Sequence, residues 1–183
     1  MSRKKIEFIF ADGTHPIVKY KDFEKNYIFW LKEFLYTKTN HLSDIKVINK
    51  EQFKFEKNKL LSLNTIDEIK ELVNNLSKNG FKGLKQYFNT NLKLLNFLKK
   101  HKFKSIEQIN TSAIVEFMKE ELDGLSGPTK RNTLVGIKNF LAFIEDNNYI
   151  DGSNSHSFNI SKNVFKILKI PKKPKIAFIH KKD

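Results

Sequence analysis

Cationic and amide side chains recur along two stretches of the sequence, at spacings that place them on one face of a helix. The first stretch ends at His101 and contains Lys82, Lys85, Gln86, Asn89, Lys93, Asn96 and Lys100. The second follows Ser126 and contains Thr129, Lys130, Arg131, Asn132 and Lys138. Because lysine ammonium groups commonly bind phosphates, both stretches predict contact with a polyanion.

Carboxylates are missing from long segments around both stretches. The chain has 20 acidic residues and a net charge of +14. Even so, no Asp or Glu occurs from Leu72 to Ile106, from Gly124 to Ile144, or from Gly152 to Lys182. An excess of lysine from an AT-rich genome would spread along the chain and would not segregate the acids. Such a charge favours a nucleic acid or an anionic surface as partner, while a plain lysine-rich solvated face remains the alternative.

Several other kinds of chemistry find no support in the sequence. There is no cysteine, and none of the seven glycines has the spacing of a phosphate-binding loop. The five histidines show no metal-ligand spacing: His15, His41, His101, His156 and His180. We therefore expect no metal and no cofactor. No apolar run approaches the roughly 18–20 residues of a membrane span, and we expect a cytoplasmic protein without a membrane partner.

Apolar periodicity predicts the helices that must position these residues. The second stretch belongs to a helix that starts after Gly124 and Ser126, with an apolar face made of Thr133, Leu134, Ile137, Phe140, Leu141 and Ile144. The first has a buried face made of Leu84, Phe88, Leu95 and Leu98, with Tyr87 and Leu94 beside them. Between them we expect a short capped turn at Ser105 and a helix from Thr111, whose exposed side is acidic and faces away from a nucleic acid.

Outside these helices the pattern is less uniform. Residues 21–38 read as a helix with Phe23, Tyr27 and Trp30 on one side, and Thr65 and Glu68 form a capping box for a helix that ends at Asn79-Gly80. Residues 1–20 and 39–63 remain unassigned. A polar loop is expected after Tyr149, followed by a short helix near residues 161–168 and an extended basic linker.

Three segments of the sequence, taken in order, resemble the core-binding domain of Xer-type tyrosine recombinases, and most of all that of the single-recombinase Xer group. They are FKGLKQYFNTNLKLLNFLKK, SIEQINTSAIVEFMKEELDGLSGPTKRNTLVGIKNFLAFIEDNN and NISKNVFKILKIPKKPK. The resemblance implies an all-α helical bundle of the SAM-like, integrase core-binding type. It also implies three parts: an N-terminal extension with a first helix and a helical insert (1–80), a core-binding domain (81–168) and a linker to a catalytic domain (169–183).

The resemblance further implies that the two polar helices face the major groove of duplex DNA or its phosphates. We expect base contacts from Gln86, Asn89, Arg131 and Asn132, because these side chain types can bridge two atoms of a base edge. The parent protein would recombine a dif-like inverted repeat, resolve chromosome dimers and act as a tetramer in synapsis, and a DNA translocase could be a further partner that activates it. The family's catalytic set includes a His-x-x-Arg pair, and this sequence has only Arg3 and Arg131 and no such pair. We therefore expect no catalysis from residues 1–183 alone.

Two alternatives remain open at this level. The aromatic first helix and the short last helix suit a contact between protomers through Phe23, Trp30, Val164 and Phe165, although such a stripe is usually core. The rival function is that of a non-enzymatic helical protein that binds RNA or an anionic surface through its lysines.

Overall fold

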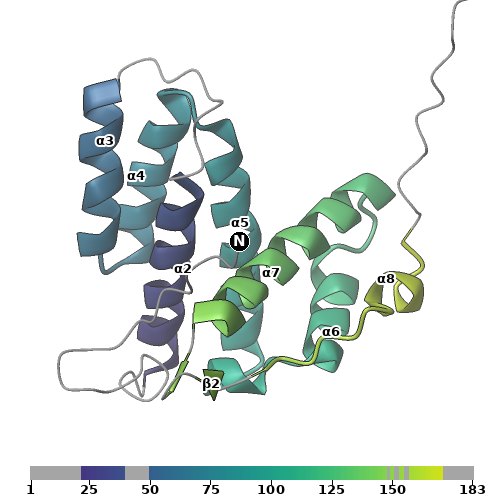
Figure 1. Ribbon diagram of the computed structural model, residues 1–183. Coiled ribbons are helices and arrows are strands. Elements are labelled where there is room, and N and C mark those ends of the chain that lie inside the picture. Colours follow the sequence, from purple (N-terminus) through teal and green to yellow (C-terminus); the bar gives the residue numbers. More distant parts are fainter. Residues whose placement is uncertain (1–21, 40–49, 148, 151–152, 155–156, 171–183) are drawn as a thin grey trace, which may run out of the picture.

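The computed structural model describes residues 22–39, 50–147, 149–150, 153–154 and 157–170. The helices within these ranges are α2 (Phe23–Thr39), α3 (Lys50–Lys59), α4 (Ile66–Lys78), α5 (Lys82–Lys100), α6 (Thr111–Glu121), α7 (Gly127–Asn147) and α8 (Val164–Ile167), with the short 3-10 turns η1 (Leu60–Ser62) and η2 (Ile106–Gln108). The expected all-α class is confirmed (Figure 1).

The caps predicted from the sequence are present where helices begin and end. Thr65 accepts a hydrogen bond from the backbone N–H of Glu68, and the Glu68 carboxylate accepts one in return from the backbone N–H of Thr65. The hydrogen bonds that the Glu68 carboxylate accepts, from the backbone N–H of Asn64 and then from that of Thr65, hold the pKa of this carboxyl below its ordinary value. Gly124 adopts φ +77°, and Ser126 accepts the N–H of Thr129 at the start of α7.

Two segments differ from the sequence-based expectation or extend it. The unassigned region contains α3 and η1, whose weak apolar pattern leaves only Phe53 and Leu60 buried. In the expected polar loop, β1 (Tyr149–Ile150) pairs antiparallel with β2 (Ser153–Asn154), a hairpin too short for periodicity to indicate. Residues 1–20, which the sequence left unassigned, and most of the expected basic linker lie outside the described residues.

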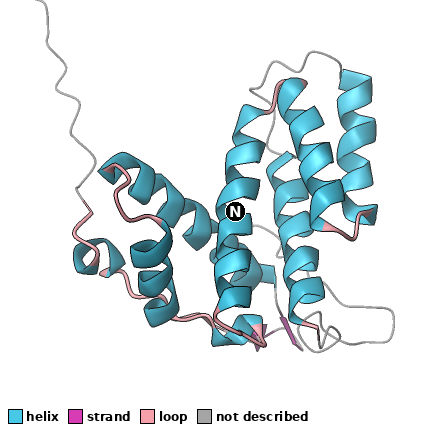
Figure 2. Cartoon of the chain, turned by 180° about the vertical axis from the view of Figure 1, so that it is seen from behind, coloured by secondary structure: helices cyan, strands magenta, loops and turns pink. Residues whose placement is uncertain are grey.

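Helix α2 joins the two halves of the molecule. Helices α3, α4 and α5 stand beside α2, and α6 and α8 lie on the other side of α5 (Figures 1 and 2). Helix α7 crosses α5, and its C-terminal part contacts α2. The ring of Tyr27 lies 5.3 Å from that of Phe140 in α7, and its hydroxyl donates to the backbone O of Asn91 in α5 at 2.7 Å. Burial raises the pKa of the Tyr27 phenol well above its ordinary value. These contacts fix α5 and α7 relative to each other through α2.

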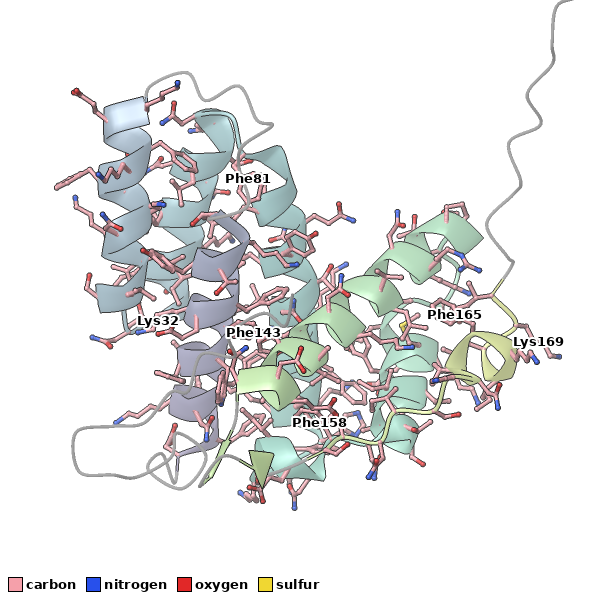
Figure 3. All side chains as sticks on the ribbon, viewed as in Figure 1. Lys32, Phe81, Phe143, Phe158, Phe165 and Lys169 are labelled. Carbon is pink, nitrogen blue, oxygen red and sulfur yellow. The ribbon has the colours of Figure 1, made fainter. Side chains whose placement is uncertain are left out.

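The segment after the hairpin is attached to α6 and α7 by hydrogen bonds. The Glu145 carboxylate accepts the backbone N–H of Phe158 at 2.6 Å, and the Thr111 hydroxyl accepts the N–H of Ser161 at 2.9 Å. Phe158 and Val164 are buried beneath this segment, and Phe158 is labelled near its start in Figure 3. Helix α8 is therefore held in place although it is only one turn long.

None of the described helices is long and apolar enough to cross a membrane. Among the same residues, no group of three or more His, Asp or Glu side chains could hold a metal ion.

Candidate nucleic-acid interface

Helices α5 and α7 approach each other closely where Thr90 meets Gly136. A Cβ placed on Gly136 would lie 3.4 Å from Cγ2 of Thr90, an ordinary contact distance, so a residue no larger than alanine allows this close approach of the two helices. From this crossing the helices diverge toward their N-terminal ends (Figure 1). Lys85, Gln86 and Asn89 of α5 and Thr129 and Asn132 of α7 lie in these diverging halves, and the crossing therefore sets the distance between them.

A groove of about 440 Å³ runs between the diverging halves. Its lining from α5 is Lys85, Gln86, Asn89, Thr90 and Lys93, and its lining from α7 is Thr129, Asn132 and Thr133. Six of these side chains are exposed, whereas Thr90 and Thr133 are buried and form the floor. Among the described residues no carboxylate lines the groove, so the charge of this lining comes from lysine.

The remaining predicted DNA-binding residues of α7 lie on its other flank. Lys130 borders a separate hollow together with Asp123 and Lys169. The guanidinium of Arg131 lies 4.9 Å and the ammonium of Lys138 lies 5.4 Å from the centroid of the Phe165 ring in α8. The structure thus divides the predicted DNA-binding residues into two groups. The groove group is Lys85, Gln86, Asn89, Lys93, Thr129 and Asn132, and the flank group is Lys130, Arg131 and Lys138. Lys82 begins α5, but its side chain lies outside the described part of the structure.

Three groove residues were missed by the sequence analysis. Gly83, Val135 and Asn139 line a second hollow that continues from the first and shares Gln86, Thr90 and Asn132 with it. Asn139 follows Asn132 by seven residues, which places both on one face after two turns, and this spacing could have revealed it. Gly83 and Val135 carry no polar side chain, and only their position shows their place in the groove.

The acidic residues of α6 do not line the groove. Glu116, Glu120, Glu121 and Asp123 are exposed on their own helix and its C-terminal end. Glu120 is bonded to Lys100, and its other oxygen lies 2.7 Å from Nε2 of His101. The hydrogen bonds from Lys100 and then from His101 hold the pKa of Glu120 below its ordinary value. Lys100 therefore ties α5 to α6 and does not extend the groove.

Two of the residues expected at a protomer interface are completely buried within the chain. Trp30 and Val164 are each 0% exposed, and Trp30 packs edge-on against Phe29 and Phe143. A side chain that its own chain covers completely cannot contact a second protomer, so for these two the expectation is corrected in favour of the core. Phe23 and Phe165 are half-buried, and an interface role for them remains a prediction.

The helix crossing leads to a testable expectation at Gly136. Gly136→Ala should leave binding and fold intact, because its Cβ meets Thr90 at an ordinary contact distance, and helix propensity should raise the free energy of unfolding by up to about 1 kcal/mol. Gly136→Leu should push α7 from α5 and lower both stability and affinity. Denaturant unfolding and a binding titration measure the two effects. An alanine variant as damaged as the leucine variant would contradict this account of the crossing.

The chain was compared with known proteins. A family model described as the phage integrase SAM-like domain matches residues 19–148. The tyrosine recombinase XerH of Campylobacter jejuni is 31% identical over 149 residues, which are 80% of this chain and 42% of that protein. The XerH of Helicobacter pylori is 24% identical over 158 residues, which are 82% of this chain and 44% of that protein.

One of the similar solved structures supports the fold. It is the crystal structure of a XerH site-specific recombinase bound to difH substrate in a pre-cleavage complex. It has a TM-score of 0.74 and 24% identity, and the match covers 82% of this chain and 45% of that one. The chain therefore spans less than half the length of the relatives it matches.

Proposed function

Because the chain belongs to the family of phage integrase SAM-like domains, we propose that it binds duplex DNA through the groove between α5 and α7. The observation that carries this proposal is the convergence of exposed lysine and amide side chains from two helices on a groove whose described lining contains no carboxylate. An α-helix fits the major groove of B-DNA, where asparagine and glutamine can bridge the donor and acceptor of adenine. Lys85 and Lys93 would contact the phosphates at its edges.

The finer part of the proposal concerns the whole protein. By analogy with its XerH relatives, the chain would form the N-terminal half of a clamp in a tyrosine recombinase. The substrate would be a dif-like inverted repeat, and the reaction would resolve chromosome dimers in the cytoplasm. Further protomers would complete a tetramer on DNA, and a DNA translocase would activate it. The nucleophilic tyrosine and the other catalytic residues would lie in the part of the recombinase that has no counterpart in this chain, since the match covers 42% of the Campylobacter jejuni relative.

The proposal is tested by a titration of the chain against four probes over a series of salt concentrations. These are a duplex that the chain itself selects from a random-sequence pool, a scrambled duplex of the same composition, a hairpin RNA and anionic lipid vesicles. We expect tightest binding to the selected duplex. The logarithm of the affinity should fall with the logarithm of the salt concentration at a slope of about 0.9 for each phosphate contacted.

Footprinting on the selected duplex completes the test. The protected bases should lie in one major groove on one face of each half-site, because α5 and α7 diverge from a single crossing. Stronger binding to RNA or to vesicles than to either duplex would reject the proposal and favour the rival function. A salt-insensitive affinity would reject a phosphate-dominated interface.

A further inference from the structure

The aromatic ring of Phe165 lies between α7 and α8 with two cations of α7 near it (Figure 3). We propose that Phe165 is a positioning residue, and that it holds Arg131 and Lys138 as a paired binding site for the phosphodiester backbone of duplex DNA. The proposal rests on the duplex binding proposed above and adds a division of labour to it. The amide side chains of the groove would read bases, and Arg131 and Lys138 on the flank would hold the backbone in addition to the groove lysines.

The placement of the two cations supports a common target. Arg131 and Lys138 are seven residues apart in α7, so two helical turns bring them to the same side of the helix. Both charges lie near one ring centroid, at 4.9 and 5.4 Å, and are therefore within roughly one Debye length of each other, about 10 Å at 0.1 M salt. Two like charges this close repel, and an anion that contacts both would lower the energy of the pair.

The ring itself favours this arrangement of the side chains. The face of an aromatic ring attracts a cation through its quadrupole, and the planar guanidinium of arginine can stack on it. A stacked guanidinium still presents the N–H groups of its edge, whose fork matches a phosphate in two hydrogen bonds. Phe165 thus limits the conformations of both cations by contact with its ring, which lowers the entropy cost of binding a phosphate.

The position on the flank argues for the backbone and not for bases. Asn132 and Thr129 occupy the side of α7 that lines the groove, whereas Arg131 and Lys138 lie on the side of α8. With α7 in the major groove, a flank directed away from α5 would meet the phosphate wall. This assignment differs from the base contact that the sequence alone suggested for Arg131.

Helix α8 is fixed firmly enough to position the ring. Val164, the neighbour of Phe165, is fully buried, and Ile170 is buried at the end of the segment. The backbone N–H of Ser161 donates to Thr111, and that of Phe158 donates to Glu145. The ring is therefore anchored to α6 and α7, and its effect on the cations does not depend on DNA.

The test compares three variants of the full chain: Phe165→Leu, which keeps an apolar side chain without a ring, Phe165→Trp, which keeps a ring, and Ile167→Ala. Ile167 lies in the same helix and is 50% exposed, so its variant is a control for changes to α8. Affinity is measured on the selected and the scrambled duplex over a salt series, and thermal unfolding is recorded for each variant.

We expect Phe165→Leu to weaken binding to both duplexes by the same factor, about 3-fold to 10-fold, and to flatten the salt dependence. Phe165→Trp should retain wild-type affinity, and Ile167→Ala should match the wild type. A double variant, Arg131→Gln with Lys138→Gln, should lower the salt slope by about two on both duplexes, and it keeps the test valid if Phe165→Leu does not fold.

The inference is overturned if Phe165→Leu binds as the wild type does, or if the losses in the double variant are confined to the selected duplex. Failure of the proposed function would look different. In that case the unmodified chain itself would show no salt-dependent binding to duplex DNA.

Discussion

A chain that carries Lys85→Glu and Lys93→Glu should bind duplex DNA about 100-fold more weakly than the unmodified chain, which corresponds to roughly 2.8 kcal/mol. Both lysines are exposed at the groove between α5 and α7. Charge reversal removes two phosphate contacts and adds repulsion, so the loss should exceed that of two neutral substitutions. Titration at fixed low salt, followed by a salt series, measures the effect and the expected decrease in slope of about 1.8.

The matched control is a chain with Lys54→Glu and Lys70→Glu. These lysines are exposed on α3 and α4, and neither lines the groove. The net charge changes by the same amount in both chains, so a general effect of charge would weaken both equally. Equal losses in the two chains would reject the groove as the binding surface and leave only diffuse attraction.

Trp30→Ala should lower the free energy of unfolding of the isolated chain by roughly 3–5 kcal/mol. Trp30 is fully buried and lies edge-on between Phe29 of its own helix and Phe143 of α7. Its removal leaves a cavity in the contact between α2 and α7, which supports the crossing beneath the groove. Denaturant unfolding followed by far-UV circular dichroism measures the loss.

Phe55→Ala is the control for this substitution. Phe55 is 62% exposed on α3, and its truncation should change stability by less than about 0.5 kcal/mol. If Trp30→Ala left the stability of the isolated chain unchanged and impaired only its assembly with further protomers, the core assignment of Trp30 would be wrong.

Every described α-helix except α3 could be predicted from the sequence, together with the side of it that is apolar. The capping box at Thr65, the left-handed Gly124 and the N-cap Ser126 are local signals, because each depends on atoms within a few residues. The polar face of α5 was also predictable, because helical spacing alone separates Lys85 and Asn89 from Leu84 and Phe88. These features need no knowledge of distant parts of the chain.

How those faces meet depends on the packing of helices that are distant in sequence. Helical periodicity places Asn132 and Arg131 side by side on α7, but the packing of α5 and α8 assigns one to the groove and the other to the ring of Phe165. Burial of Trp30 likewise depends on Phe143, which lies far along the sequence. The repeat of 3.6 residues fixes the direction in which each side chain points from its own helix axis. Which residue that side chain then contacts depends on how the helices pack against one another.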